Sequence, residues 1–193
     1  MKAVGAIRMP RWSREQYEKM IATGIFPPGT RAELIDGEIS SMTPQKRQHA
    51  AAIRAAEEAL RVVFETGYDV QVQLPLALDP SSEPEPDLSV IQGSWRDYRD
   101  AHPSSAVLVI EIADTSLDYD RDCKGSLYAR SRIQDYWIVN LTDRCVEVYR
   151  DPTPSTGAHC GWIYRTSQYY ASGQNLAPLA VPSRSIAVDD LLP

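Results

Sequence analysis

The sequence has little cysteine and little phenylalanine, and it contains no long hydrophobic run. Three cysteines in 193 residues form an odd and sparse set, which fits a reducing cytoplasm better than a disulfide framework. The longest apolar run, residues 106–110, is far shorter than the ~20 residues that a membrane helix needs. The first residues also lack the apolar stretch of a secretory signal. We therefore expect a cytoplasmic protein with no membrane helix.

Positive charge is scarce as well. There are 20 lysine and arginine residues against 26 aspartate and glutamate residues, so the net charge is −6 and the pI is about 5.1. This balance argues against a protein that coats nucleic acid non-specifically, although a local basic stripe could still hold phosphates. The cysteines and His159 lack the paired spacing of a zinc site. There is also no glycine-rich phosphate loop and no Gly-x-Ser-x-Gly elbow.

What the chain does contain is a regular succession of helix and strand patterns in one domain, residues 1–193. Ser13 and Gln16 form a capping-box pattern at the start of the first helix, and Asp36-Gly37 is a strong two-residue hairpin signal. In chain order we expect a helix over 12–23, the hairpin, a helix over 46–66, strands over 68–78, 88–91 and 106–112, a helix over 119–131, strands over 136–140 and 146–149, and weaker strands over 162–166 and 185–188.

The strand over 106–112 is almost continuously apolar, which is typical of a central strand that is buried on both faces. The helix that follows it leads to another apolar strand, so a parallel crossover is expected between the two. The pattern predicts an α/β fold, with a mixed β-sheet core flanked by helices. The core would span about 30–150, with C-terminal strands in 151–193.

Two acids lie at the ends of apolar strands. Asp87 directly precedes the strand over 88–91, and Glu111 lies within the most apolar strand. A carboxylate in a buried strand needs a partner, a metal ion or a proton, because an unpaired buried charge is costly. Two carboxylates from neighbouring strands can chelate Mg²⁺, which lowers the pKa of a bound water and stabilises charge on a phosphate.

A lysine follows on the next helix. Asp120, Lys124 and Tyr128 share one face of that helix at a spacing of four residues. A lysine close to a metal-bound water could orient the water as a nucleophile or stabilise the charge that develops on the phosphate. Glu33, just before the Asp-Gly turn, could add a further carboxylate.

Three segments carry a family resemblance: ELIDGEISSMTP, then PEPDLSVI, then VLVIEIADTSLDYDRDCKGSLYARSRIQDYWIVNLTDRCVEVYRDP, with a histidine between the first two. In this order, over about 30–150, they resemble the Uma-type family of bacterial restriction endonucleases, a branch of the PD-(D/E)XK nuclease superfamily. The resemblance implies a restriction-endonuclease-like fold and Mg²⁺-dependent hydrolysis of DNA phosphodiester bonds, with Mn²⁺ as a substitute ion. A homodimer would suit cleavage of both strands.

The resemblance also assigns roles to residues. Asp87 matches the acid of the Pro-Asp motif, and Glu111 matches the second acid. The superfamily pattern has its lysine two residues after the second acid, where this chain has Ala113. Lys124 matches the lysine that the Uma-type branch carries on the helix.

Further positions match less constant features of the family. Glu33 matches an acid of the leading hairpin, and Asp114 matches an acid of some members. The main-chain carbonyl of Ile112 would be a third metal ligand by analogy with the superfamily. His49 matches a histidine that the family places near its site.

Each of these residues also has a structural interpretation. Asp87 could cap the turn after Pro86, and Glu111 could belong to an ion-pair network with Lys124. His49 lies on the apolar stripe of the long helix, which favours a satisfied, partly buried histidine. Tyr128, Tyr136 and Trp137 are expected to pack in the core or at its edge.

Two other functions stay open. One is a non-catalytic nucleic-acid-binding or regulatory protein that retains the nuclease fold, which the acidic charge favours. The other is a homo-oligomeric structural protein, in which the surface aromatics Tyr164, Tyr169 and Tyr170 form the interface.

Overall fold

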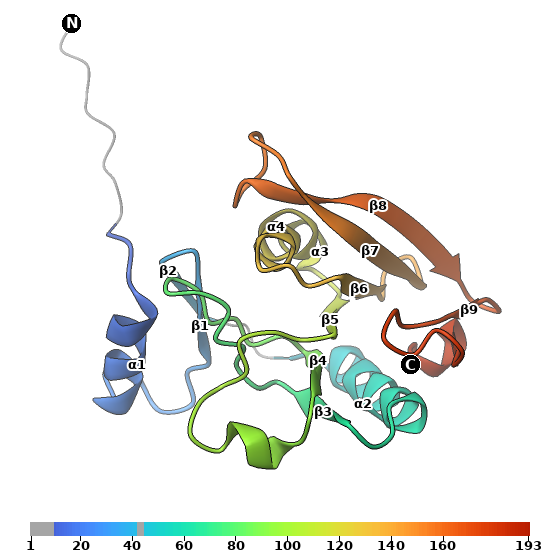
Figure 1. Cartoon of the computed structure of the whole chain (residues 1–193), viewed down its shortest axis with the longest axis horizontal. Coiled ribbons are helices and arrows are strands. Elements are labelled where there is room, and N and C mark those ends of the chain that lie inside the picture. The colour runs from blue at the N-terminus through green and yellow to red at the C-terminus, as the bar shows by residue number, and fades with distance from the viewer. Residues whose placement is uncertain (1–9, 42–44) are drawn as a thin grey trace, which may run out of the picture.

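A six-stranded mixed sheet forms the centre of the computed structural model, which describes residues 10–41 and 45–193 (Figure 1). Its strand order is β3-β4-β5-β6-β7-β8, and β5 and β6 are parallel while every other neighbouring pair is antiparallel. The bounds are β3 Tyr68–Val72, β4 Leu88–Gln92, β5 Leu108–Ala113, β6 Asp135–Asn140, β7 Cys145–Pro154 and β8 Trp162–Ala171. The expected mixed sheet and the parallel crossover between its central strands are confirmed.

A small hairpin and several helices surround this sheet. The hairpin pairs β1 (Ala32–Ile35) with β2 (Glu38–Ser41), and β9 (Asn175–Leu176) pairs with β10 (Ile186–Ala187). The helices are α1 Arg14–Ala22, α2 Arg47–Val63, α3 Leu117–Tyr119, the π-helical turn η2 Asp120–Lys124 and α4 Gly125–Arg130, with 3₁₀ turns η1 Trp95–Tyr98 and η3 Val188–Asp190. Within the described ranges, no helix is both long enough and apolar enough to cross a membrane.

Local signals in the sequence explain the first elements. The side chain of Ser13 accepts from the Gln16 N–H and the Gln16 side chain accepts from Ser13 N–H, so the capping box of α1 is confirmed. Asp36 and Gly37 both adopt positive φ, 47° and 84°, as a type I′ hairpin turn requires. The last three residues of the ELIDGEISSMTP motif, 42–44, lie outside the described residues.

The two faces of the sheet are covered by different helices, as Figure 1 shows. Leu108, Ile110 and Ile112 of β5 pack in the same cluster as α2, and each fully buried aliphatic side chain contributes about 1.5–3 kcal/mol. Val109 belongs to the cluster on the other face, together with Tyr128 of α4. Because side chains alternate along a strand, Glu111 points to the α4 face.

Several expected boundaries were wrong. The strand over 68–78 ends at Val72, because Gln73 turns the chain with a φ of 52°. The helix expected over 119–131 begins at Leu117 and contains the π-helical turn. β7 and β8 are much longer than the expected 146–149 and 162–166, so the central sheet continues past residue 150.

The aromatic surface expected near the C-terminus is smaller than predicted. Tyr164 is only partly exposed: its hydroxyl donates to the Ile133 carbonyl and its ring stacks on Tyr136. Tyr170 is also half-buried and packs against the main core. Tyr169, with 59% of its surface exposed, is the member of the expected set that does lie on the surface.

Candidate active site

The sheet register brings Asp87 and Glu111 together. Leu88 pairs with Ile110 across β4 and β5, so Asp87 lies opposite Glu111 at the next position of this antiparallel pair. The Asp87 N–H donates to Glu111 Oε2 at 3.3 Å, and the Ile112 N–H donates to Asp87 Oδ2 at 2.9 Å. Both side chains are almost fully buried, with residue exposures of 6% and 3%. The two acids therefore converge, as the order of the motifs predicts.

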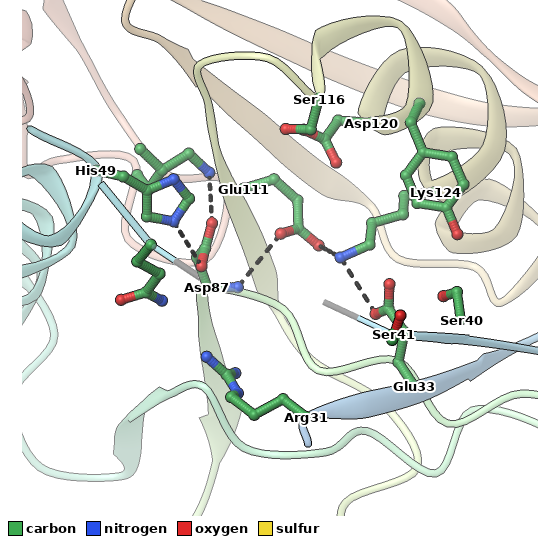
Figure 2. Close-up of a pocket in the computed structure, with 13 residues that line it drawn as sticks. Arg31, Glu33, Ser40, Ser41, His49, Asp87, Glu111, Ser116, Asp120 and Lys124 are labelled. Atoms are coloured by element: carbon green, nitrogen blue, oxygen red, sulfur yellow. Dashed lines mark hydrogen bonds and ion pairs between the residues drawn. The ribbon is translucent and has the colours of Figure 1, made fainter. Parts of the chain in front are cut away.

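Lys124 reaches these acids from the π-helical turn. Its Nζ lies 3.0 Å from Glu111 Oε1 and 3.2 Å from Glu33 Oε2, and the residue is 4% exposed. Figure 2 shows Glu111 between Asp87 on one side and Lys124 on the other. Single π-helical turns within helices occur frequently at functional sites. The helix thus brings Lys124 to Glu111, whereas the position two residues after Glu111 holds Ala113.

Three more side chains hold the two central carboxylates. The Tyr128 hydroxyl donates to Glu111 Oε1 at 2.7 Å, and Gln73 Nε2 donates to Asp87 Oδ1 at 3.2 Å. His49 Nε2 lies 3.1 Å from the same Asp87 oxygen. The sequence favours core packing for Tyr128 and a strand position for Gln73, so neither contact is predicted from the sequence alone. The four-residue spacing from Lys124 to Tyr128 was the one available signal.

Asp87, Glu111 and Lys124 line a cleft of about 280 Å³, to which the β1–β2 hairpin, α2, β5 and the α3–η2 segment also contribute, whereas Tyr128 and Gln73 lie outside its lining. Asp120 also lines it, almost fully buried, and accepts a hydrogen bond from Ser116. The lining residues are Arg31, Glu33, Ser40, Ser41, Gln45, His49, Asp87, Glu111, Ile112, Ser116, Tyr119, Asp120 and Lys124. All but one of the side chains expected at the site therefore share a single cleft.

Asp114 is the exception. Its carboxylate lies 2.7 Å from Lys46 Nζ, and Asp114 does not line the cleft. Ile112 does line it, and its N–H is bound to Asp87. The role of the Ile112 carbonyl as a metal ligand stays a prediction.

The electrostatics of the cleft are dominated by acid. Four carboxylic residues, Glu33, Asp87, Glu111 and Asp120, are buried around Lys124. Burial raises the pKa of Glu111 to about 8 and that of Asp120 to about 6. Burial alone would lower the pKa of Lys124, but the surrounding carboxylates raise it well above its usual value. Lys124 therefore stays protonated and acts as a hydrogen-bond donor rather than as a base.

Asp87 behaves differently from Glu111 and Asp120. Burial alone would raise its pKa, but the contact with His49 and the Ile112 N–H hold the pKa of Asp87 below its usual value. Asp87 is therefore ionised at neutral pH and its oxygens are hydrogen-bond acceptors. An ionised carboxylate next to a second buried acid is a pair that a cation would stabilise.

This donor set fits a hard divalent cation. Within residues 10–41 and 45–193, no group of three or more His, Cys, Asp or Glu residues is placed to hold a metal ion, which argues against a closed, all-protein cage. Mg²⁺ instead takes one or two carboxylates and keeps several waters. Asp87 and Glu111, adjacent in the cleft, supply two such carboxylates.

Two comparisons with known proteins gave a match. The sequence profile of the Uma2 family, described as "Putative restriction endonuclease", matches residues 14–189. Among solved structures, the chain resembles one from Anabaena variabilis ATCC 29413, described as "a putative nuclease belonging to DUF820". The TM-score is 0.65 at 14% identity, and the match covers 93% of this chain and 96% of that one. At this identity the match shows the fold. No curated protein matches the sequence.

Proposed function

The chain belongs to the Uma2 family, and from this premise we propose that it is a nuclease that hydrolyses DNA phosphodiester bonds with Mg²⁺ as cofactor. The observation that carries the proposal is the convergence of Asp87, Glu111 and Lys124 in one cleft. Two carboxylates that can hold a cation, beside a protonated amine, can together stabilise the charge that develops on the phosphate during hydrolysis. Mn²⁺ would substitute for Mg²⁺, because it also prefers oxygen ligands.

In this proposal each residue has a separate task. Asp87 and Glu111 hold the divalent cation, which supplies stabilisation of the negative charge that builds on the phosphate. Lys124, fixed by Glu111 and Glu33, donates a hydrogen bond to the attacking water or to a phosphate oxygen.

A second positively charged side chain, that of Arg31, lines the cleft and is available to the DNA backbone. Arg31 Nε and Nη2 both bond to one oxygen of Glu85, at 3.2 and 2.8 Å, and its side chain is 35% exposed. Among the described residues, Arg31 is the one arginine that lines the cleft. A partly exposed guanidinium can bind a phosphate through its remaining N–H groups. We assign Arg31 to a phosphate next to the cleaved one.

The test is cleavage of supercoiled plasmid DNA by the purified protein across a range of Mg²⁺ concentrations. Cleavage should require the divalent ion, stop on addition of a chelator, and be abolished in Asp87→Asn and in Glu111→Gln. Asp118→Asn is the matched control, since Asp118 is an exposed acid on α3. Activity that persists unchanged in both site variants would overturn the proposal. Saturable DNA binding without any cleavage would instead favour a non-catalytic binding protein.

A further inference from the structure

The two oxygens of Glu111 are not equivalent. In the ionised form that would bind a cation, a carboxylate offers about four acceptor sites, shared equally between its oxygens. Oε1 accepts from Lys124 at 3.0 Å and from the Tyr128 hydroxyl at 2.7 Å, so its acceptor sites are filled. Oε2 accepts from the Asp87 N–H alone among the described residues, at the longer distance of 3.3 Å. Oε2 therefore keeps acceptor capacity for a cation.

Asp87 shows the same asymmetry. Its Oδ1 accepts from Gln73 Nε2 at 3.2 Å and lies 3.1 Å from His49 Nε2, so this oxygen also has both acceptor sites occupied. Oδ2 accepts from the Ile112 N–H at 2.9 Å, and within the described ranges it has no other donor. Oδ2 of Asp87 is thus the counterpart of Oε2 of Glu111.

We propose that Tyr128 and Gln73 are positioning residues: by occupying Glu111 Oε1 and Asp87 Oδ1, they leave Oε2 and Oδ2 to bind the divalent cation. This inference rests on the cation of the proposed function. His49 contacts the same oxygen of Asp87 as Gln73 does, and Lys124 contacts the same oxygen of Glu111 as Tyr128 does. His49 and Lys124 therefore share the positioning role. Partners of metal-binding carboxylates fix which oxygen faces the ion, and their removal typically weakens metal binding about 10–100-fold.

Packing alone does not explain the Tyr128 hydroxyl. Tyr128 is fully buried, with its ring 5.0 Å from that of Tyr136. A phenylalanine would fill the same space, and a buried hydroxyl is costly unless it has a partner. The hydroxyl finds that partner in Glu111. The hydroxyl of Tyr128 therefore serves to bind Glu111 and is not needed to fill space in the core.

Gln73 is held in an unfavourable backbone conformation. Its φ of 52° is uncommon for a residue other than glycine, asparagine or aspartate, and strained backbone clusters at functional sites. Both its main-chain N–H, which donates to the Asp87 carbonyl at 3.1 Å, and its side-chain amide hold Asp87. Two bonds from one residue fix both the main chain and the carboxylate of Asp87.

The experiment is calorimetric titration of the purified protein with Mg²⁺ and then Mn²⁺, without DNA. Tyr128→Phe removes one hydroxyl. Gln73→Asn keeps a residue that tolerates positive φ but shortens the side chain, so the amide no longer reaches Asp87. Both variants should weaken cation binding about 10–100-fold. In plasmid cleavage, both should need more Mg²⁺ and recover most of the rate at saturating Mg²⁺.

Matched controls separate positioning from stability. Tyr164→Phe removes a hydroxyl from the same tyrosine cluster, where it binds the Ile133 carbonyl. Gln71→Asn shortens a buried glutamine of β3 whose Oε1 has no partner among the described residues. Both controls should bind Mg²⁺ like the unaltered protein, even where the melting temperature falls.

The outcomes distinguish this inference from the function on which it rests. If the unaltered protein binds Mg²⁺ and both Tyr128→Phe and Gln73→Asn bind it equally well, the positioning role is refuted and the proposed function stands. If the unaltered protein binds neither cation, the proposed function fails and takes the inference with it. Should Tyr128→Phe not fold, Gln73→Asn decides the question alone.

Discussion

Replacing Lys124 by methionine removes one buried positive charge while keeping a side chain of similar length. In the unaltered protein this charge lies 3.0 Å from Glu111 and 3.2 Å from Glu33, and all three residues are at most 4% exposed. Breaking a buried ion pair by removing one partner costs about 3–5 kcal/mol. In a domain of this size 1 kcal/mol corresponds to about 2–4 °C, so the melting temperature should fall by roughly 10 °C.

The loss should depend on pH, and its sign follows from the acids that remain. Without Lys124, burial and mutual repulsion raise the pKa of Asp120, which is about 6 in the unaltered protein, and that of Asp87, because Lys124 lowers both. A carboxyl group with a raised pKa in the folded state costs little stability below its unfolded pKa, and the cost grows as the pH rises above that value. The deficit of Lys124→Met should therefore be large at pH 8 and small at pH 5.

The assay is urea unfolding of both proteins at the two pH values, in the absence of divalent ions. Addition of Mg²⁺ at pH 8 should stabilise the variant more than the unaltered protein, because the ion replaces part of the missing charge. An equal loss of stability at pH 5 and pH 8 would refute the assignment of Lys124 as the counter-charge of the buried acids.

Three further predictions concern Arg31, which lines the cleft, and two residues that do not line it, Glu83 and Gly37. Arg31→Ala should weaken DNA binding measured in Ca²⁺ and reduce the slope of log K against log salt by about 1; an unchanged slope would contradict a phosphate contact. Glu83 is buried, its Oε2 has no partner among the described residues, and burial raises its pKa to about 7. Glu83→Gln should therefore stabilise the protein against unfolding by about 1–2 kcal/mol at pH 8 but not at pH 4. Equal stability of the variant and the unaltered protein at pH 8 would count against this prediction. Gly37→Ala should destabilise the hairpin by about 1–3 kcal/mol, because Gly37 has a φ of 84° and a Cβ there would lie 2.8 Å from the Cβ of Arg11; a thermal melt that does not shift would contradict this strain.

The features that could be predicted from the sequence are those set by local chemistry and strand periodicity. The capping box at Ser13 and the Asp36-Gly37 turn need few neighbours to form. The apolar run before Glu111 indicated a central strand, and β5 is indeed paired on both sides. Once this strand is central, an acid within it must meet other polar groups, so the convergence with Asp87 could be foreseen.

The supporting contacts could not be predicted, because they depend on long-range geometry. Gln73 carries no glycine-like signal for its positive φ, and its role depends on meeting Asp87 across a chain reversal. Tyr128 has the sequence pattern of a core aromatic residue and is buried in the core. The contact of its hydroxyl therefore cannot be predicted unless the position of Glu111 is known. The length of the β7–β8 hairpin is set by pairing across it, which the polar and proline-containing sequence did not suggest.

The most direct test of the cation site is diffraction from crystals soaked in Mn²⁺, with data collected for anomalous scattering. The account predicts one strong anomalous peak in the cleft, within coordination distance of Asp87 and Glu111, that disappears in Glu111→Gln crystals. Crystals that contain Mn²⁺ only elsewhere, or that show no peak between these two carboxylates at saturating Mn²⁺, would contradict it.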